Sequence, residues 1–100
     1  GVTLEADNVA RFPDAPTARG VKHVEELIRC MEDGYEAYLL LVIQMKGVTR
    51  FEPNWDTHRE FGETLQKAQK AGVHILAYDC LIEPDRMEIQ DHVPVRLERD

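Results

Sequence analysis

Apolar residues recur at helical spacing in two stretches of this 100-residue chain. The first stripe consists of Val21, Val24, Leu27, Ile28 and Met31. It predicts a helix over residues 18–33, with Thr17 as the N-cap and Gly34 as the stop. The second stripe consists of Phe61, Leu65 and Ala68. It predicts a helix that begins at a Thr57/Glu60 capping box and ends at Gly72.

Continuous apolar runs predict the main strands. Residues 38–43 form the core of a strand predicted over 35–45, and their lack of polar alternation indicates cover on both faces in a parallel sheet. Residues 73–82 predict a second strand. Shorter strands are expected at 2–4, 87–90 and 93–97, a short apolar piece at 9–12 that enters the Pro-rich loop, a loop at 47–55 and a turn at 83–86. This order predicts one α/β domain over residues 1–100, with a mixed or mostly parallel sheet flanked by helices.

The net charge of −7 disfavours a general affinity for nucleic acid, although a local basic cluster can oppose that total. The start of the chain lacks the pattern of a signal peptide, and the longest apolar run, residues 37–43, is too short to span a bilayer. The two cysteines, Cys30 and Cys80, show no metal-binding spacing and are expected to be buried, reduced thiols. These features predict a cytoplasmic protein without a membrane partner.

Candidate chemistry gathers where the Pro-rich loop at residues 12–17 leads into the first helix. Arg19, Lys22, His23 and Glu26 lie at i, i+3, i+4 and i+7, which places them on one face apart from the apolar stripe. Arg19 and Lys22 are suited to neutralising phosphates, and His23 to positioning water or a phosphate oxygen. The alternative is a solvated face, with Arg19 paired to Glu26 or to the loop.

Asp14 and Gln44 are the other two candidates. Asp14 either orders its loop through a turn hydrogen bond or lies near a metal. Gln44 follows residues 38–43, at the carboxyl end of a strand, where sites form in open α/β sheets. A metal site made of Asp14, His23 and Glu26 is a weaker alternative, since His-x-x-Glu often occurs by chance.

One further pattern is a basic-aromatic patch formed by Arg50, Phe51 and Trp55, which would stack single-stranded bases. The alternative is that Phe51 and Trp55 pack the 47–55 loop onto the second helix. We favour packing.

Several strings along the chain, taken together, resemble one family. They are Val2-Thr3-Leu4, Phe12-Pro13-Asp14-Ala15, Thr17, Arg19-Gly20, Lys22-His23, Glu26-Leu27, Arg50-Phe51, Pro53-Asn54, Asp56, Phe61, Leu65, Ala68, Gly72-Val73, Ile75-Leu76-Ala77-Tyr78 and Val93-Pro94-Val95. In this order and spacing the chain resembles the sugar fermentation stimulation protein family, SfsA.

The resemblance implies an N-terminal OB-like domain followed by a domain similar to PD-(D/E)xK nucleases, of which this chain is the C-terminal part. It also implies DNA binding and a regulatory role in sugar, notably maltose, utilisation. In that nuclease-like fold an Asp and a Glu-x-Lys hold a divalent metal, Mg or Mn, and orient water. The family's Glu-x-Lys strand leads into the segment matched by residues 2–4, so these motif residues are not in this chain.

We therefore assign no catalytic residue, metal ligand or cofactor within the 100 residues, and expect nuclease activity only in a full-length form. Arg19, Lys22, His23 and Gln44 are the predicted DNA-binding or site-lining residues. The alternative function is a non-catalytic regulatory or protein-interaction domain on the same scaffold. Because strands that precede residue 2 are missing, the chain is also expected to form a homodimer or to lean on residues outside it.

Overall fold

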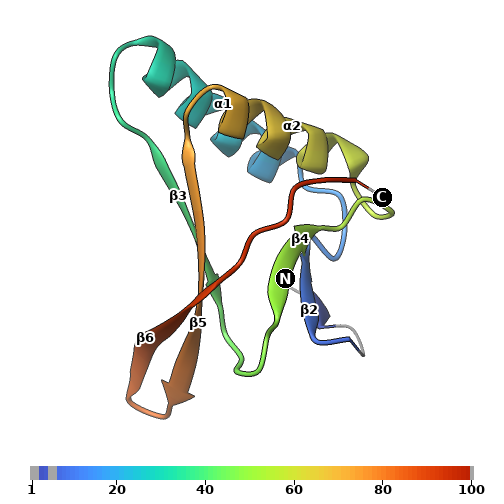
Figure 1. Ribbon diagram of the computed structural model, residues 1–100, viewed down its shortest axis with the longest axis vertical. Coiled ribbons are helices and arrows are strands. Elements are labelled where there is room, and N and C mark those ends of the chain that lie inside the picture. Colours follow the sequence, from blue (N-terminus) through green and yellow to red (C-terminus); the bar gives the residue numbers. More distant parts are fainter. Residues whose placement is uncertain (1–2, 5–6, 100) are drawn as a thin grey trace.

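The protein folds into two helices and six strands, described here from a computed structural model for residues 3–4 and 7–99 (Figure 1). The elements in chain order are β1 (Thr3–Leu4), β2 (Val9–Phe12), α1 (Ala18–Glu32), β3 (Tyr38–Ile43), β4 (Arg50–Pro53), α2 (Arg59–Lys70), β5 (His74–Glu83) and β6 (Arg86–Val93). The α/β class predicted from the sequence is confirmed. Val2, part of the first predicted strand, lies outside the described residues.

The strands form two mixed sheets of three strands each, in the orders β1-β2-β4 and β3-β5-β6. In the first sheet β1 pairs antiparallel with β2, and β2 pairs parallel with β4. In the second sheet β3 pairs parallel with β5, and β5 pairs antiparallel with β6. Mixed pairing was expected, but its division between two small sheets was not.

Helix α1 begins and ends where the sequence predicts. The Thr17 hydroxyl accepts a hydrogen bond from the Gly20 backbone N–H at 3.0 Å, which satisfies one of the unpaired donors of the first turn. After the helix, Gly34 has φ +91°, a conformation that a residue without Cβ adopts without strain.

The predicted capping box of α2 is wrong. The helix begins at Arg59, its N-cap is His58, and the His58 side chain makes no capping hydrogen bond to the first turn. Thr57 lies too early, because the backbone N–H groups of Thr57 and His58 donate to the Asn54 carbonyl in a preceding turn. His58 Nδ1 instead accepts from the backbone N–H of Thr17 at 3.2 Å, which links the starts of the two helices.

The predicted loop at residues 47–55 contains strand β4. This strand pairs with β2 on one side, where Phe51 is the register partner of Ala10, and on its other side the Phe51 backbone bonds the C-terminal segment. There its N–H donates to the Pro94 carbonyl at 2.8 Å and its carbonyl accepts from the Arg96 N–H at 2.9 Å. The strand predicted at 87–90 lies within β6, whereas of the strand predicted at 93–97 only Val93 belongs to β6, and Val95 forms an isolated bridge with Phe51.

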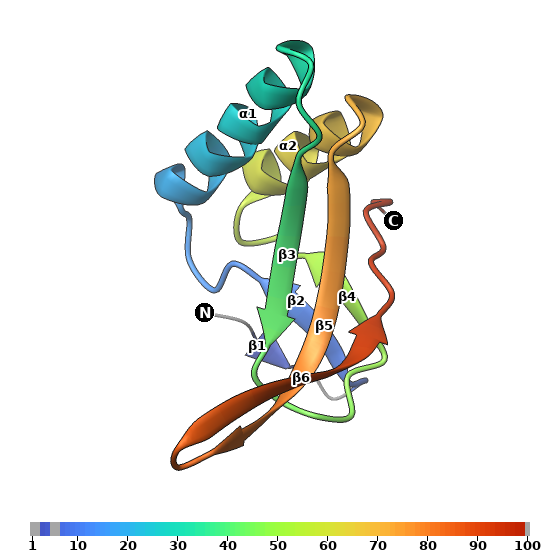
Figure 2. The same cartoon turned by 90° about the vertical axis from the view of Figure 1, so that its left-hand side faces the viewer.

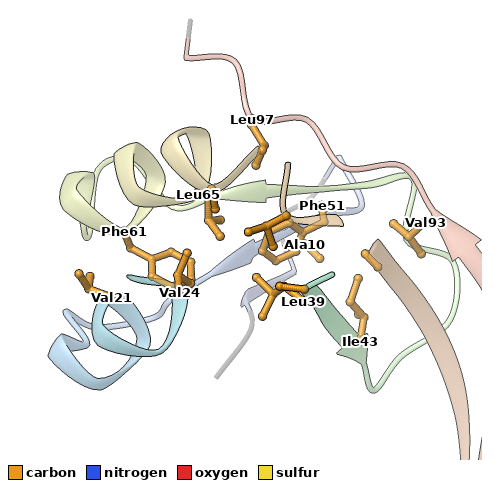
Figure 3. Close-up of a cluster of buried hydrophobic side chains, with 14 residues drawn as sticks. Ala10, Val21, Val24, Leu39, Ile43, Phe51, Phe61, Leu65, Val93 and Leu97 are labelled. Atoms are coloured by element: carbon orange, nitrogen blue, oxygen red, sulfur yellow. The ribbon is translucent and has the colours of Figure 1, made fainter. Parts of the chain in front are cut away.

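One hydrophobic core lies between the inner faces of both sheets and the paired helices (Figure 3). It draws Val21 and Val24 from α1, Phe61, Leu65 and Ala68 from α2, Ala10 and Phe51 from the first sheet, and Leu39, Ile43, Ala77 and Val93 from the second. The apolar stripes predicted for the two helices therefore face the same core. Both helices lie together at one end of the molecule, above the inner sides of the sheets (Figure 1).

Cover on both faces of β3 is a wrong prediction. Leu39 and Ile43 are buried, whereas Tyr38 is 60% exposed and Leu40 is 49% exposed. Side chains alternate across a strand, so the exposed pair lies on the outer face of the β3–β5 sheet. Neither helix covers that face (Figure 2), and so the helices do not flank the sheet on both sides.

The two cysteines also differ from expectation in one respect. Cys80 is buried, and its thiol lies 3.4 Å from the Ile43 carbonyl, but Cys30 is exposed on α1. Residue 30 lies outside the apolar stripe of its helix, which explains its exposure.

No helix in the described part of the chain is long and apolar enough to cross a bilayer.

Candidate functional site

The predicted basic face of α1 is exposed. Arg19, Lys22 and His23 all lie in the first two turns of the helix with exposed side chains. None of these three side chains has a hydrogen bond or ion pair with another described residue, and the alternative pairing of Arg19 with Glu26 does not form. Their polar groups are therefore available to a ligand.

The other two predicted residues lie in loops and not on this helical face. Gln44 is exposed in the bend after β3, and Asp14 is exposed in the loop before α1, where it has interactions of its own. Across residues 3–4 and 7–99, no three His, Cys, Asp or Glu side chains gather as metal ligands. The alternative site of Asp14, His23 and Glu26 is therefore not assembled.

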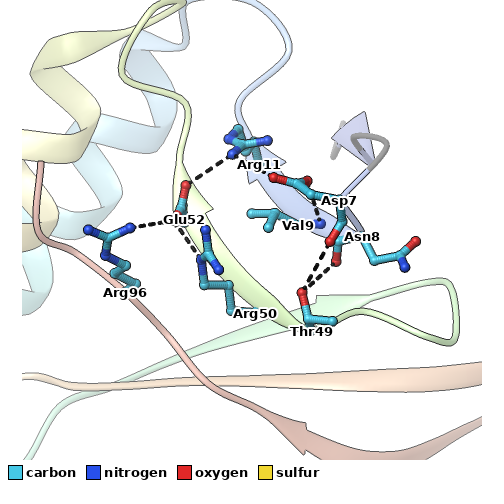
Figure 4. A network of polar contacts seen from close by, with 8 residues as sticks. All are labelled: Asp7, Asn8, Val9, Arg11, Thr49, Arg50, Glu52 and Arg96. Carbon is cyan, nitrogen blue, oxygen red and sulfur yellow. Dashed lines mark hydrogen bonds and ion pairs between the residues drawn. The ribbon is translucent and has the colours of Figure 1, made fainter. Parts of the chain in front are cut away.

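A second polar cluster, which the sequence did not reveal, is centred on Glu52 (Figure 4). Glu52 is only 8% exposed, and its carboxylate contacts three guanidinium groups. Arg11 NH2 lies 3.3 Å from Oε1, whereas Arg50 Nε and Arg96 NH1 lie 2.7 Å and 3.4 Å from Oε2. We call Arg11, Arg50, Glu52 and Arg96 the arginine cluster.

Strand alternation places this cluster on the outer face of the first sheet. Arg11 is the register partner of Glu52, and Arg50 lies two residues before Glu52 on the same face. The intervening residue, Phe51, points into the core. Arg96 can contact Glu52 because the bridge between Val95 and Phe51 places the C-terminal segment alongside β4.

Asp7 extends the cluster at its edge. Its carboxylate accepts from the backbone N–H of Val9 at 3.1 Å and lies 3.6 Å from Arg11. The Val9 hydrogen bond, and then the Arg11 charge, lower the pKa of Asp7 below its ordinary value of 3.8. Two carboxylates, of Asp7 and Glu52, and three guanidinium groups thus make up the extended cluster.

The sequence could not reveal the arginine cluster because its members are drawn together by pairing between distant segments. Arg11 and Arg96 are far apart along the chain, and residues 50–53 read as a loop. The only local signal is the spacing Arg50-x-Glu52, which places both side chains on one face if the segment is a strand.

Trp55 packs against α2 and is not free to stack on a base. A Cβ added to Gly62 would lie 2.6 Å from its ring, and the Arg99 guanidinium carbon lies 5.7 Å from the ring centroid. Phe51 is completely buried. The packing interpretation of these two aromatic residues is confirmed, and the stacking patch is not formed.

A third polar cluster fastens the β-bulge between β5 and β6. The buried Asp79 carboxylate accepts from the Asp91 backbone N–H at 2.9 Å and from Lys46 Nζ at 3.2 Å, and Lys46 also lies 3.1 Å from Asp91. The Asp91 hydrogen bond, and then Lys46, lower the pKa of Asp79 below its ordinary 3.8. Hydrogen bonds to the Asp91 and Asp79 carboxylates raise the pKa of Lys46.

Because the pKa of Asp79 is lower in the folded state, its charge stabilises the fold above the ordinary value and loses this effect as the pH falls through the lowered value. We expect Asp79→Asn to reduce the free energy of unfolding at pH 7, and the difference from wild type to shrink below about pH 4. Urea unfolding at several pH values measures this, with Asp85→Asn in the exposed β5–β6 turn as the control. A difference that stays constant down to pH 3 contradicts the prediction.

These features define an α/β protein with mixed sheets, two helices on one side of its core, an exposed basic face on α1 and a partly exposed arginine cluster. A family model described as "Sugar fermentation stimulation protein RE domain" matches residues 1–86. The chain belongs to the sugar fermentation stimulation protein (SfsA) family, and the match is to the family's C-terminal region.

Two curated relatives show how much of the family's length this chain represents. It is 57% identical to the sugar fermentation stimulation protein homolog of Clostridium beijerinckii, and the match covers 97% of this chain and 43% of that protein. The homolog of Ruminiclostridium cellulolyticum is 56% identical over the same shares of the two chains. The chain thus spans about two fifths of the length of these relatives.

A solved structure supports the fold. Pyrococcus furiosus SfsA in complex with Ca2+ superposes with a TM-score of 0.84 and 28% identity. The superposition covers 95% of this chain and 42% of that chain.

Proposed function

We propose that this chain is the C-terminal region of a DNA-binding SfsA protein that regulates sugar, notably maltose, utilisation on a PD-(D/E)xK nuclease-like scaffold. The observation that carries the proposal is the α1 face, where Arg19, Lys22 and His23 are exposed and have no ion-pair partner among the described residues. Three donors on two helical turns suit a phosphate backbone, and membership of the SfsA family supports the same conclusion.

The three side chains would contact phosphate groups in different ways. The planar guanidinium of Arg19 can hold two phosphate oxygens at once, whereas Lys22 supplies a compact charge. His23 would donate to a phosphate oxygen or orient water. Asp14 would order the loop that leads into α1, whereas Gln44, in the bend after β3, lies apart from this face and is given no role in it.

A complete metal site is not proposed within this chain. The Pyrococcus furiosus protein binds Ca2+ in its structure, and Ca2+ is a hard cation that takes six to eight oxygen ligands in proteins. The described residues of this chain offer no group of three candidate ligands, so they do not fit such a site on their own. Nuclease activity with Mg or Mn, if the full-length protein has it, would depend on carboxylates outside these residues.

The test is a salt titration of double- and single-stranded DNA binding by the full-length protein and its Arg19→Ala variant. Because each phosphate contact releases counterions, the variant should bind several-fold more weakly, with a log–log salt slope shallower by about one. Arg59→Ala, which removes the same charge from an exposed position on α2, is the control. Unchanged binding in Arg19→Ala removes this face from the DNA site.

The second candidate is a non-catalytic regulatory or protein-interaction domain. The uncovered apolar side chains of Tyr38 and Leu40 and the charge of −7 favour it. The same titration separates the two: DNA binding weakens steeply as salt rises, whereas docking through an apolar face is nearly insensitive to salt.

A further inference from the structure

We propose that residues 94–98 present an open sheet edge, to which an extended peptide of a partner protein adds as a further strand. These residues follow β6, pass β4 and approach α2 (Figure 1). A groove of about 540 Å3 separates them from α2, and it is lined by Gln66, Gln69 and Lys70 of the helix and by residues 95–98. The inference does not depend on DNA binding, and it uses none of the residues of the α1 face.

The backbone of residues 94–98 is paired on one side only. The Pro94 carbonyl accepts from the Phe51 N–H, and the Arg96 N–H donates to the Phe51 carbonyl. Because successive residues of an extended segment direct their backbone groups to alternate sides, the N–H and C=O of Val95 point away from β4. Neither of these two groups, nor the Leu97 N–H, has a hydrogen bond to another described residue. An edge of this kind is a template for the backbone of another strand.

One position on this edge is already occupied by a side chain. The Leu97 carbonyl accepts from Gln66 Nε2 at 2.7 Å, so the side-chain amide takes the place of a backbone N–H of a neighbouring strand. A peptide is therefore limited to the Val95 groups and the Leu97 N–H. The Leu97 side chain is only 5% exposed and points into the core, which holds the edge in place before a partner arrives (Figure 3). A preformed edge loses less entropy on binding.

Contacts along α2 give the direction of this edge. Arg99 lies 5.7 Å from the ring centroid of Trp55, and that ring packs against Gly62 in the first half of α2. Further along the helix, Gln66 bonds to Leu97, which is an earlier residue of the C-terminal segment. The segment therefore runs antiparallel to α2.

Two charges at opposite ends of the groove define the partner. Lys70, the last residue of α2, lies at the Val95 end, and Glu98 lies at the other end. Both side chains are exposed, and neither has an ion pair with another described residue. A peptide paired antiparallel, the slightly more stable arrangement, places an earlier residue beside Glu98 and a later one beside Lys70. Because Val95 and Glu98 are three residues apart, the partner that fits has a basic residue followed three residues later by an acidic one.

The test measures binding of a fluorescein-labelled peptide, Thr-Lys-Val-Thr-Glu-Val, to the full-length protein by fluorescence anisotropy. Lys70→Glu should weaken binding about fivefold, the upper value for an exposed ion pair. Lys67→Glu makes the same change at an exposed position of α2 outside the groove and should leave binding unchanged. The double variant Lys70→Glu/Glu98→Lys should prefer a peptide in which Lys and Glu are exchanged. Equal affinity of all these proteins for both peptides contradicts the assignment of the partner.

Strand pairing needs a separate measurement, because charge alone would also attract the peptide. In the proposed register the Glu of the peptide lies opposite Val95, and its N–H donates to the Val95 carbonyl. N-methylation of this Glu should abolish binding, whereas N-methylation of the preceding Thr, whose N–H points away from the edge, should change it little. Equal binding of the two methylated peptides overturns strand pairing.

The full-length protein decides whether the edge is open to a partner. If neither it nor the 100-residue chain binds the peptide, the site is overturned. If only the 100-residue chain binds, the additional residues of the longer protein cover the edge, and the proposal of a partner protein is overturned. Both results leave the DNA-binding proposal standing, because the α1 face takes no part in them.

Discussion

Glu52→Ala is expected to lower the free energy of unfolding by about 3 kcal/mol, the lower end of the range for removing one partner of a buried ion pair. The carboxylate holds together β2, β4 and the C-terminal segment through Arg11, Arg50 and Arg96. Without it, three guanidinium groups would face one another over a sheet surface. The effect stays at the low end because these side chains are 24–37% exposed and partly hydrated.

Urea unfolding at neutral pH measures this loss, with two comparison variants. Glu52→Gln keeps the size and a hydrogen-bond acceptor but removes the charge, so its loss should be smaller than that of the alanine variant. Glu88→Ala breaks an exposed 3.7 Å pair with Arg86 and should change stability by less than about 1 kcal/mol. A loss below about 1 kcal/mol in Glu52→Ala would mean that the cluster contributes little to folding.

What the sequence predicts well are the features that depend on local contacts. Helix α1 follows from its own stripe, its Thr17 cap and its Gly34 stop, because these interactions span only a few residues. The same reasoning failed at Thr57, where a turn around Asn54 displaces the cap by one residue. Boundaries defined by a single hydrogen bond are sensitive to such neighbouring turns.

Features that depend on distant pairing escaped prediction. Strand β4 exists because β2 and the segment at Val95 bond to its two edges, and its own residues, which include Pro53 at its end, read as a loop. The arginine cluster depends on the same pairing, so it was missed as well. Of the candidate site, only the α1 face could be predicted, because helical periodicity alone assembles it.

The sequence also did not predict which side chains of strand β3 are buried. The apolar run at residues 38–43 correctly predicted a strand paired in parallel, but not which of its faces other elements would cover. Tyr38 and Leu40 are part of the same apolar run as their buried neighbours, yet they lie on the open side of the sheet. An apolar residue has a tendency to be buried, but the tertiary arrangement decides whether another element covers it.

The second large effect that we expect is self-association of the isolated chain through strand β3. Among the described strands β3 pairs only with β5, so one of its edges offers unpaired backbone donors and acceptors beside the exposed Tyr38 and Leu40. Antiparallel pairing of β3 with β3 of a second copy would satisfy this edge and bury the apolar side chains by a two-fold axis. We therefore expect the 100-residue chain to dimerise.

Leu40→Lys should weaken that dimer roughly hundredfold, because each copy would lose about 1.5 kcal/mol or more of apolar burial. Sedimentation velocity over a broad concentration range measures the change. Ile82→Lys is the matched control, since Ile82 is similarly exposed but lies near the tip of the β5–β6 hairpin. A chain that is monomeric at every concentration contradicts the prediction. If only the full-length protein is monomeric, its additional residues cover this face, and the edge of β3 is then an internal contact of the longer protein.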